Sequence, residues 1–170
     1  MDQSELVTLL TDAETSLFHE AYFGFRLEEE FKKSRRFGWP LSLVIMEVEG
    51  LDALAPGDGG RARRSALLEL SNTILSGTRS EDITGRLGPA RFGMLLPNTP
   101  AEGLQEMAHR VMSAVLKGSE DSISLCVGAT CAPQDDLERA VEFQARAEKG
   151  LEVSRGQGSN QLVIWTAPSA

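Results

Sequence analysis

The chain has 170 residues, of which 41% are hydrophobic and 25% charged, a composition typical of one folded domain rather than of a disordered segment. Its formal net charge of −8 argues against binding to a nucleic acid polymer, because the phosphate backbone repels an acidic surface. The longest apolar run, residues 41–46, is too short to cross a bilayer, and the acidic N-terminus lacks the basic region of a signal peptide. We therefore expect a cytoplasmic protein with no membrane insertion.

The first half of the chain predicts two helices around one strand. Residues 20–37 place aromatic and aliphatic side chains among charges at helical spacing, and Gly38-Trp39-Pro40 ends this helix. Residues 41–49, LSLVIMEVE, predict a strand buried on both faces, since the run is mostly apolar rather than alternating. The glycines and proline of residues 55–60 predict a loop, and helical spacing returns over residues 62–76.

The second half of the chain predicts a β-hairpin, two helices and two strands. In chain order, we expect the hairpin at residues 83–97, a helix at 99–117, a strand at 122–130, a helix at 135–154 and a strand at 161–165. Thr99 and Glu102 have the spacing of a capping box at the start of the first of these helices. Because the hairpin makes two neighbouring strands antiparallel while the other connections are helical, the predicted fold class is α+β, with a mixed central sheet flanked by helices.

The cysteines and the basic residues do not form a recognisable binding motif. Cys126 and Cys131 are five residues apart, so they are expected on opposite faces of one strand, as reduced thiols in or near the core. Basic clusters at residues 32–36 and 61–64 have the charge to bind a small anion, but we favour their interpretation as solvated helix surfaces. The sequence predicts no metal site and no cofactor.

The hairpin carries a resemblance to a known family. Residues 86–97 read RLGPARFGMLLP, which resembles the signature hairpin of GGDEF (diguanylate cyclase) domains, where an arginine precedes a Gly-Gly-Asp/Glu-Glu-Phe tip and the next strand ends in Leu-Pro. Further landmarks follow in the family's order, at residues 12–17, 47–51, 79–82, 127–129 and 155–160. The resemblance implies a palm-like nucleotidyl-cyclase sheet with its signature hairpin at 83–97. We expect this domain over residues 12–166, between an N-terminal segment at 1–11 and a tail at 167–170.

The resemblance also implies that the catalytic site is degenerate. The family holds divalent metal against GTP with one carboxylate from a strand end and another from the hairpin tip. This chain keeps Glu47 at the strand end, but its tip reads Gly88-Pro89-Ala90-Arg91. Ala90 offers no carboxylate, Arg91 repels a cation, and Pro89 lacks the backbone N–H that would face a phosphate. We therefore expect no metal and no catalysis, with Glu47 a solvent-facing acid.

The residues that face guanine and the phosphates in the family also differ in this chain. By spacing, Ala55 and Arg64 stand where the family reads the base with Asn and Asp, and neither offers an acceptor for the guanine N–H groups. Asp52 stands in place of a lysine and Ser159 in place of a phosphate-binding arginine, while Arg155 keeps the charge of a nearby lysine. Together, these differences imply that the domain is not an enzyme.

A second family site survives in the sequence. Active members bind their product, cyclic di-GMP, at an R-x-x-D motif completed by an arginine from the following helix. Arg79 and Asp82 match this motif, and Arg110 matches the second arginine. Guanidinium groups donate to guanine N7 and O6 or to phosphates, and a carboxylate accepts from N1–H and N2–H₂. The resemblance thus predicts a signalling domain that binds cyclic di-GMP through these residues and relays it to a protein partner or a homodimer.

Two other functions stay open at this point. Arg79, Asp82 and Arg110 are also common surface residues, so the fold can equally serve as a ligand-independent interaction or scaffold module. A residual enzyme with altered nucleotide chemistry ranks last, because the metal carboxylates are incomplete.

Overall fold

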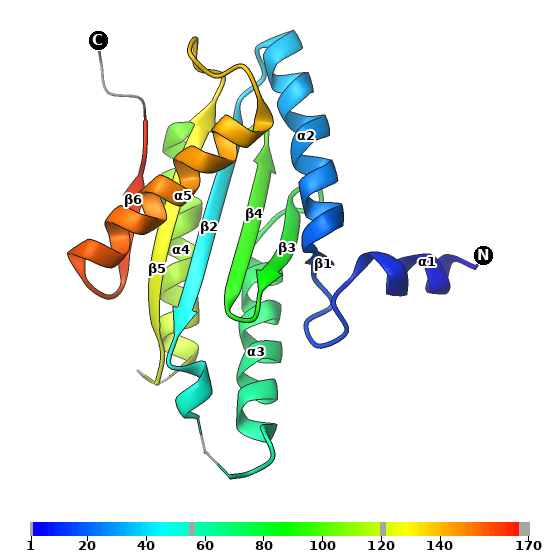
Figure 1. Ribbon diagram of the computed structural model, residues 1–170, viewed down its shortest axis with the longest axis vertical. Coiled ribbons are helices and arrows are strands. Elements are labelled where there is room, and N and C mark those ends of the chain that lie inside the picture. The colour runs from blue at the N-terminus through cyan, green and yellow to red at the C-terminus, as the bar shows by residue number, and fades with distance from the viewer. Residues whose placement is uncertain (1, 55–56, 120–121, 167–170) are drawn as a thin grey trace.

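The computed structural model describes residues 2–54, 57–119 and 122–166, and Figure 1 shows how its elements are arranged. The described chain forms one sheet of six strands in the order β1–β3–β4–β2–β5–β6. The strands are β1 Phe18–His19, β2 Leu41–Glu49, β3 Ile83–Gly88, β4 Arg91–Pro97, β5 Ser124–Ala132 and β6 Gln161–Ile164. The helices are α1 Gln3–Leu10, α2 Glu20–Phe37, α3 Arg61–Gly77, α4 Ala101–Gly118 and α5 Ala140–Gln157, with a 3₁₀ helix, η1, at Leu51–Ala53.

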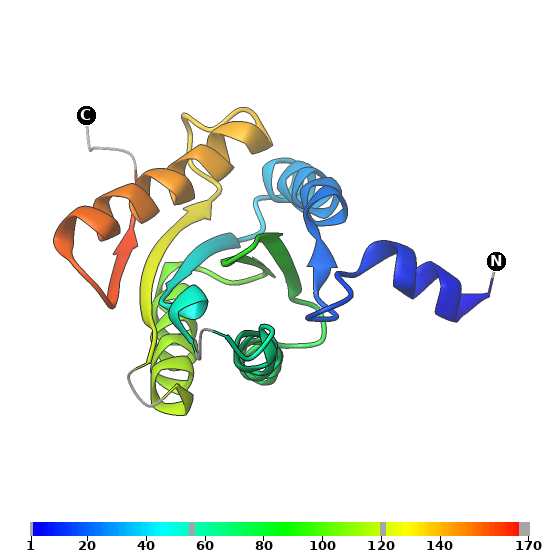
Figure 2. The same ribbon diagram turned by 60° about the horizontal axis from the view of Figure 1, so that its bottom comes forward.

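The sheet is mixed, and helices cover both of its faces. The inner pairs β3–β4, β4–β2 and β2–β5 are antiparallel, whereas the outer pairs β1–β3 and β5–β6 are parallel. Helices α2 and α5 cover one face, and α3 and α4 cover the other (Figure 1, Figure 2). The predicted α+β class and the hairpin at residues 83–97 are therefore confirmed.

The central strand β2 supplies both layers of the core. Leu43 and Ile45 belong to the cluster under α2 and α5, and Val44 and Met46 to the cluster under α3 and α4. All four side chains are at most 1% exposed, which confirms the prediction of a strand buried on both faces. Each contributes about 1.5–3 kcal/mol of hydrophobic stabilisation, so β2 anchors the positions of its neighbours.

The two cysteines of β5 lie on opposite faces of that strand, as the spacing predicts. Cys126 is buried in the cluster under α2 and α5, and Cys131 packs against the cluster under α3 and α4. Burial raises the pKa of both thiols, so both stay protonated and unreactive at neutral pH.

Helix α5 packs directly on the backbone of β5. A Cβ atom added at Gly128 would lie 2.0 Å from the Leu151 nitrogen and 2.1 Å from the Ala147 oxygen, both in the backbone of α5. A Cβ added at Gly150 would lie 2.7 Å from the Val163 oxygen of β6. Only glycine permits this approach, which fixes α5, and with it Arg155, against the end of the sheet.

Two of the predicted helix starts are wrong. Helix α4 begins at Ala101 with Pro100 as its N-cap, because the Thr99 hydroxyl donates back to the Pro97 oxygen and does not cap the helix. Helix α5 begins at Ala140 rather than at residue 135, because the Asp136 carboxylate pairs with Arg146 and does not cap a helix. Strand β5 also lies two residues later than predicted, at Ser124–Ala132.

Candidate functional site

The strand end and the hairpin tip meet at the same end of the sheet, as the family motif predicts. The Val48 N–H of β2 donates to the Ala90 oxygen of the tip at 2.9 Å, and Glu47 stands opposite Arg91 in the register of β2 and β4. The Ala90 side chain packs against the core cluster under α3 and α4. At the tip position that the resemblance compares with a metal-binding carboxylate, the chain therefore places a methyl group packed on the core.

The Glu47 carboxylate forms ion pairs with two arginines. It pairs with Arg155 from α5, and the Arg91 Nε lies 3.5 Å from the same oxygen. Its side chain is 30% exposed, so the acid that was expected to face solvent is partly buried and is paired with two cations. Arg91 also lies 3.8 Å from Glu148 of α5. Arg155, expected to keep the charge of a family lysine, pairs that charge with Glu47.

This group of residues does not fit the divalent metal that the family uses. Mg²⁺ prefers several oxygen ligands in near-octahedral geometry, but the Glu47 carboxylate is paired with two guanidinium groups and the Glu49 carboxylate accepts from the Ser124 hydroxyl. A cation would have to displace Arg91 and Arg155 from Glu47 while experiencing their repulsion. No step of a metal-dependent reaction can therefore be derived through Glu47.

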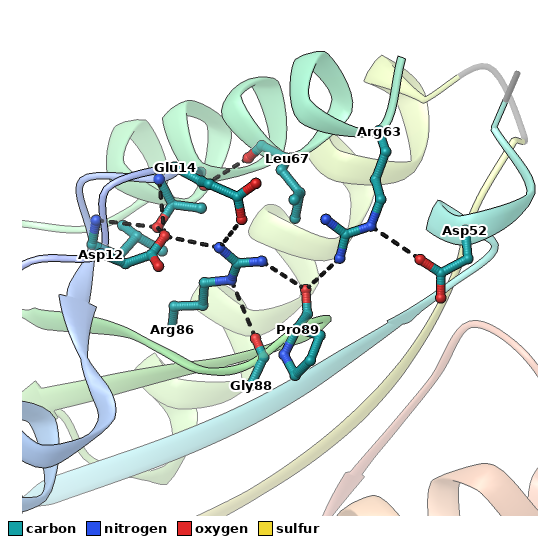
Figure 3. A network of polar contacts seen from close by, with 11 residues as sticks. Asp12, Glu14, Asp52, Arg63, Leu67, Arg86, Gly88 and Pro89 are labelled. Carbon is teal, nitrogen blue, oxygen red and sulfur yellow. Dashed lines mark hydrogen bonds and ion pairs between the residues drawn. The ribbon is translucent and has the colours of Figure 1, made fainter. Parts of the chain in front are cut away.

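A second network of arginines holds the hairpin tip, and Figure 3 shows its members. The Arg86 side chain is only 9% exposed, and its guanidinium donates to Asp12 at 2.9 Å and to Glu14 at 2.6 Å. It also donates to the Pro89 oxygen at 3.0 Å and to the Gly88 oxygen at 3.2 Å. The tip backbone is thereby tied to the segment that precedes β1.

The charges of this network shift the titration of Asp12. Burial works to raise the pKa of Asp12, but hydrogen bonds from Thr15 and Arg86 outweigh it and hold the pKa below the ordinary aspartate value. Arg63 from α3 completes the network: it donates to Asp52 at 3.0 Å and to the Pro89 oxygen at 3.3 Å. Asp52 is therefore paired with an arginine of its own chain.

Two other positions that the resemblance compares with the family's nucleotide pocket also make contacts within the chain. The Arg64 guanidinium donates to the Gly59 backbone oxygen at 3.0 Å, and the backbone oxygen of Ser159 accepts from the Gln161 side chain at 3.3 Å. Ala55, predicted at a base-reading position, lies outside the described residues. Arg63 and Arg86 were not identified as pocket residues from the sequence, although Arg86 is the arginine that opens the hairpin motif.

The structure brings Arg79, Asp82 and Arg110 together near the C-terminus of α3. Arg79 and Asp82 form a tight turn before β3: the Arg79 N–H donates to the Asp82 Oδ2 at 2.7 Å, and the Asp82 N–H to the Arg79 oxygen at 3.2 Å. Arg110 reaches over from α4 and donates to the Gly77 oxygen, the last residue of α3, at 2.9 Å. The site is thus built from one loop and one neighbouring helix.

Asp82 is the electrostatically unusual member of this group. Its Oδ1 is buried and has no hydrogen-bond partner among the described residues. Burial raises the pKa of Asp82, and the Arg79 N–H with the charges of Arg79 and Arg110 offsets this only in part. A buried acceptor without a donor carries a desolvation cost that no hydrogen bond among the described residues offsets.

A groove between α3 and α4 continues from this site. It has a volume of about 600 Å³ and is lined by Gly77 and Arg110 at the end nearest the site and by Leu68 and Ser65 further along α3.

No helix among the described residues is long and apolar enough to cross a membrane.

Comparison with known protein families supports the assignment of this fold. The family model described as "Diguanylate cyclase, GGDEF domain" matches residues 9–161. Over 165 residues, the chain is 27% identical to the probable diguanylate cyclase DgcE of Escherichia coli (strain K12), covering 94% of this chain and 15% of that protein. It is also 27% identical over 161 residues to the diguanylate cyclase DgcP of Pseudomonas aeruginosa, covering 91% of this chain and 24% of that protein. The chain spans about a quarter or less of the length of these relatives.

Solved structures share the fold over nearly the whole chain. The diguanylate cyclase SiaD in complex with its activator SiaC from Pseudomonas aeruginosa has a TM-score of 0.83 at 24% identity, covering 95% of this chain and 64% of that one. The GGDEF domain of DgcB from Caulobacter crescentus in complex with c-di-GMP has a TM-score of 0.80 at 16% identity, covering 92% and 93%. At these identities, the likeness establishes the fold.

Proposed function

This chain belongs to the GGDEF domain family of diguanylate cyclases, and from that premise we propose that it is a catalytically inactive member that binds cyclic di-GMP at Arg79, Asp82 and Arg110. In this proposal, it acts in the cytoplasm, where the bound dinucleotide changes its association with a protein partner or with a second copy of itself. The proposal makes no use of a metal or a cofactor.

One observation carries the ligand proposal. The buried Oδ1 of Asp82 has no donor among the described residues, and two arginines lie close enough to influence its pKa. Guanine presents N1–H and N2–H₂ side by side, which suits a carboxylate, and cyclic di-GMP carries two phosphate charges for the two guanidinium groups. A rotation of the Asp82 side chain that exposes Oδ1 to a guanine edge would satisfy the oxygen that the protein leaves unpaired.

Catalytic inactivity is supported by the contacts of the residues that replace the family's metal ligands. Glu47 is paired with Arg91 and Arg155, and Ala90 packs its methyl group on the core. Restoring catalysis would require the removal of two cations and the addition of at least one carboxylate.

The relatives suggest which class of ligand and partner to test. The DgcB domain was solved with c-di-GMP, and SiaD was solved with the activator protein SiaC. Both properties belong to those proteins, and for this chain they motivate the choice of ligand and the search for a protein partner.

Calorimetric titration with cyclic di-GMP tests the proposal. We expect binding to the unmodified chain, and at least tenfold weaker binding to Arg79→Ala and Arg110→Ala. Arg61→Ala is the matched control, because it removes an exposed arginine at the opposite end of α3 and should leave the affinity unchanged. No heat and no thermal shift at high micromolar ligand would refute the receptor function and favour the ligand-independent scaffold.

A second assay tests inactivity. The chain incubated with GTP and either Mg²⁺ or Mn²⁺ should give no cyclic product by chromatography. Clear turnover that disappears in Glu47→Ala would overturn the assignment of an inactive site.

A further inference from the structure

Two aromatic side chains lie exposed at the C-terminal end of α2. Phe37 is 52% exposed and Trp39 50% exposed, and their rings stack with centroids 4.8 Å apart. Exposed apolar groups of this size, held side by side, mark interaction sites more often than scattered single residues do. This end of α2 lies at the top of the molecule in Figure 1, at the opposite end of the sheet from Glu47 and the hairpin tip.

The backbone under the two rings is fixed. Gly38 adopts a left-handed conformation with φ of 70°, and its N–H donates to the Ser34 oxygen at 2.8 Å, which closes the helix. The hydroxyl of Ser34, a residue that is 2% exposed, donates to the Trp39 oxygen at 2.7 Å. Phe37 is the last residue of α2, and Gly38 and Trp39 are each held by a hydrogen bond to Ser34. The backbone that carries the two rings is therefore preorganised and would lose little entropy on binding.

Two arginines beside the rings form no ion pair with a carboxylate among the described residues. The Arg36 guanidinium lies 5.2 Å from the centre of the Phe37 ring, and Arg35 donates to the backbone oxygen of Glu138 at 2.6 Å. By contrast, the other basic side chains of α2 are paired with glutamates of the same helix. We call Arg35, Arg36, Phe37 and Trp39 the α2-end patch.

A groove of about 560 Å³ adjoins the α2-end patch, between α2 and the start of α5. Its basic lining residues are Lys32, Arg35, Arg36 and Arg139, and its acidic ones are Glu28 and Glu138. Glu28 is paired with Lys32 at 3.4 Å and Arg139 with Glu142 at 3.0 Å. The lining charges left outside these pairs are Arg35, Arg36 and Glu138, so the groove keeps a small excess of positive charge. Arginines in the last turn of a helix also stabilise its dipole, but that effect does not explain two exposed stacked rings.

From this combination, we propose that the α2-end patch binds an acidic segment of a protein partner, with carboxylates on Arg35 and Arg36 and an apolar or aromatic side chain on the ring pair. The local excess of positive charge lies on a chain of net charge −8, which repels acidic segments elsewhere, so an acidic segment is attracted to this part of the surface. Arginine and aromatic residues are also the types that dominate binding energy at interfaces. This inference is independent of the cyclic di-GMP site and concerns a different part of the surface.

Fluorescence anisotropy tests the proposal on the full chain. The probe is a fluorescein-labelled heptapeptide with several carboxylates around a Leu-Phe pair, and the comparison peptide replaces each acid by lysine. We expect the acidic peptide to bind, and Arg36→Glu and Phe37→Ser each to weaken it by about tenfold or more. The matched control is Lys117→Glu, which makes the same charge change on an exposed residue at the other end of the fold and should change the affinity less than twofold. Thermal unfolding of each variant confirms that the patch variants are folded.

A second readout locates the contact. Trp39 and Trp165 are the two tryptophans of the chain, so Trp165→Phe leaves Trp39 as the sole reporter, and the acidic peptide should change its emission. Equal binding of the acidic and basic peptides, unchanged Trp39 emission, or equal affinity of Arg36→Glu and Lys117→Glu would overturn the proposal. Tighter binding of a single-stranded oligo-dT than of the acidic peptide would overturn it in favour of a nucleic-acid surface.

Discussion

Replacing Asp82 by asparagine should weaken cyclic di-GMP binding while making the free protein more stable. The change conserves shape and keeps one side-chain oxygen for the Arg79 N–H, a bond of 2.7 Å in the folded chain. It removes the second acceptor, the buried Oδ1, and the negative charge that the guanine donors would meet.

The loss of affinity follows from one charge-assisted interaction. A hydrogen bond to a charged group is worth about 1.5–3 kcal/mol, so the dissociation constant should rise about 10- to 150-fold. The gain in stability follows from the pKa of Asp82, which burial raises in the folded state. Since the folded chain then holds its proton more tightly than the unfolded chain, the ionised carboxylate costs stability above the folded-state pKa, and stability rises as the pH falls through it.

The expected loss of affinity and the expected gain in stability can be measured on the same variant. Calorimetry gives the affinity, and urea unfolding at neutral pH gives the free energy of unfolding; Asp82→Asn should bind weakly and unfold at higher urea than the unmodified chain. The matched control is Asp135→Asn, because it makes the same change at an exposed residue far along the chain from Asp82 and should affect neither quantity by more than a small amount. An asparagine variant that binds as well as the parent, or that is less stable, would refute the reasoning from the unpaired oxygen.

Three further predictions concern the scaffold that positions the sites. Gly128→Ala should lower the free energy of unfolding by at least about 2 kcal/mol, because the new methyl group overlaps the α5 backbone. Gly24→Ala, in an open position of α2, should instead raise the free energy of unfolding by about 0.5–1 kcal/mol. Chemical denaturation of the two variants would contradict this prediction if both changed the free energy of unfolding in the same direction. Arg86→Met should destabilise the fold by about 2 kcal/mol, because it removes the hydrogen bond from Arg86 to Asp12. The stability that Asp12 contributes is present above the ordinary aspartate pKa and is lost as the pH falls through its lowered pKa. The stability of the variant should therefore depend less on pH in the acid range. If the free energies of unfolding of parent and variant fell by the same amount across the acid range, the assigned role of the bond between Arg86 and Asp12 would be contradicted. Leu43→Ala should cost about 2–5 kcal/mol in a urea titration, because its side chain is fully buried in the central strand, and a cost below about 1 kcal/mol would contradict that placement.

The elements that the sequence predicted well are those whose signal is local and repeated. The aromatic residues of α2 recur at helical spacing over 18 residues, and the apolar run of β2 has no competing interpretation, so the bounds of both elements match the structure. Strand β1 was missed because its two residues show no periodicity and are held by pairing with β3, far along the chain.

The predicted starts of α4 and α5 were wrong because the polar side chains expected to cap them bond to other partners, which local sequence patterns do not reveal. Glu142 caps α5 by accepting from the Glu138 and Arg139 N–H groups, which leaves Asp136 to Arg146. Local patterns identify residues that are able to cap a helix, but tertiary contacts decide which of them do so.

In the candidate site, too, sequence motifs predicted some of the contacts, whereas others depend on the tertiary structure. Motif spacing predicted that Glu47 and Ala90 would meet, and the bond between Val48 and Ala90 confirms it. The motif could not show that Arg155, 108 residues further along the chain, would turn onto Glu47, because that contact depends on how close α5 approaches the sheet. The close glycine contact at Gly128 sets that distance, and nothing in the local sequence encodes it.

The strand order has a consequence for how the molecule opens. Strand β2 has a hydrogen-bonded neighbour on each side and helices over both faces, whereas β1 and β6 are the edge strands of the sheet. Amide hydrogens of Leu43 to Met46 should therefore exchange with solvent deuterium only through global unfolding, while those of the edges exchange through local opening. The domain keeps its slowest-exchanging amides in the middle of the sheet, and the surfaces that contact ligands and partners lie in the layers around it.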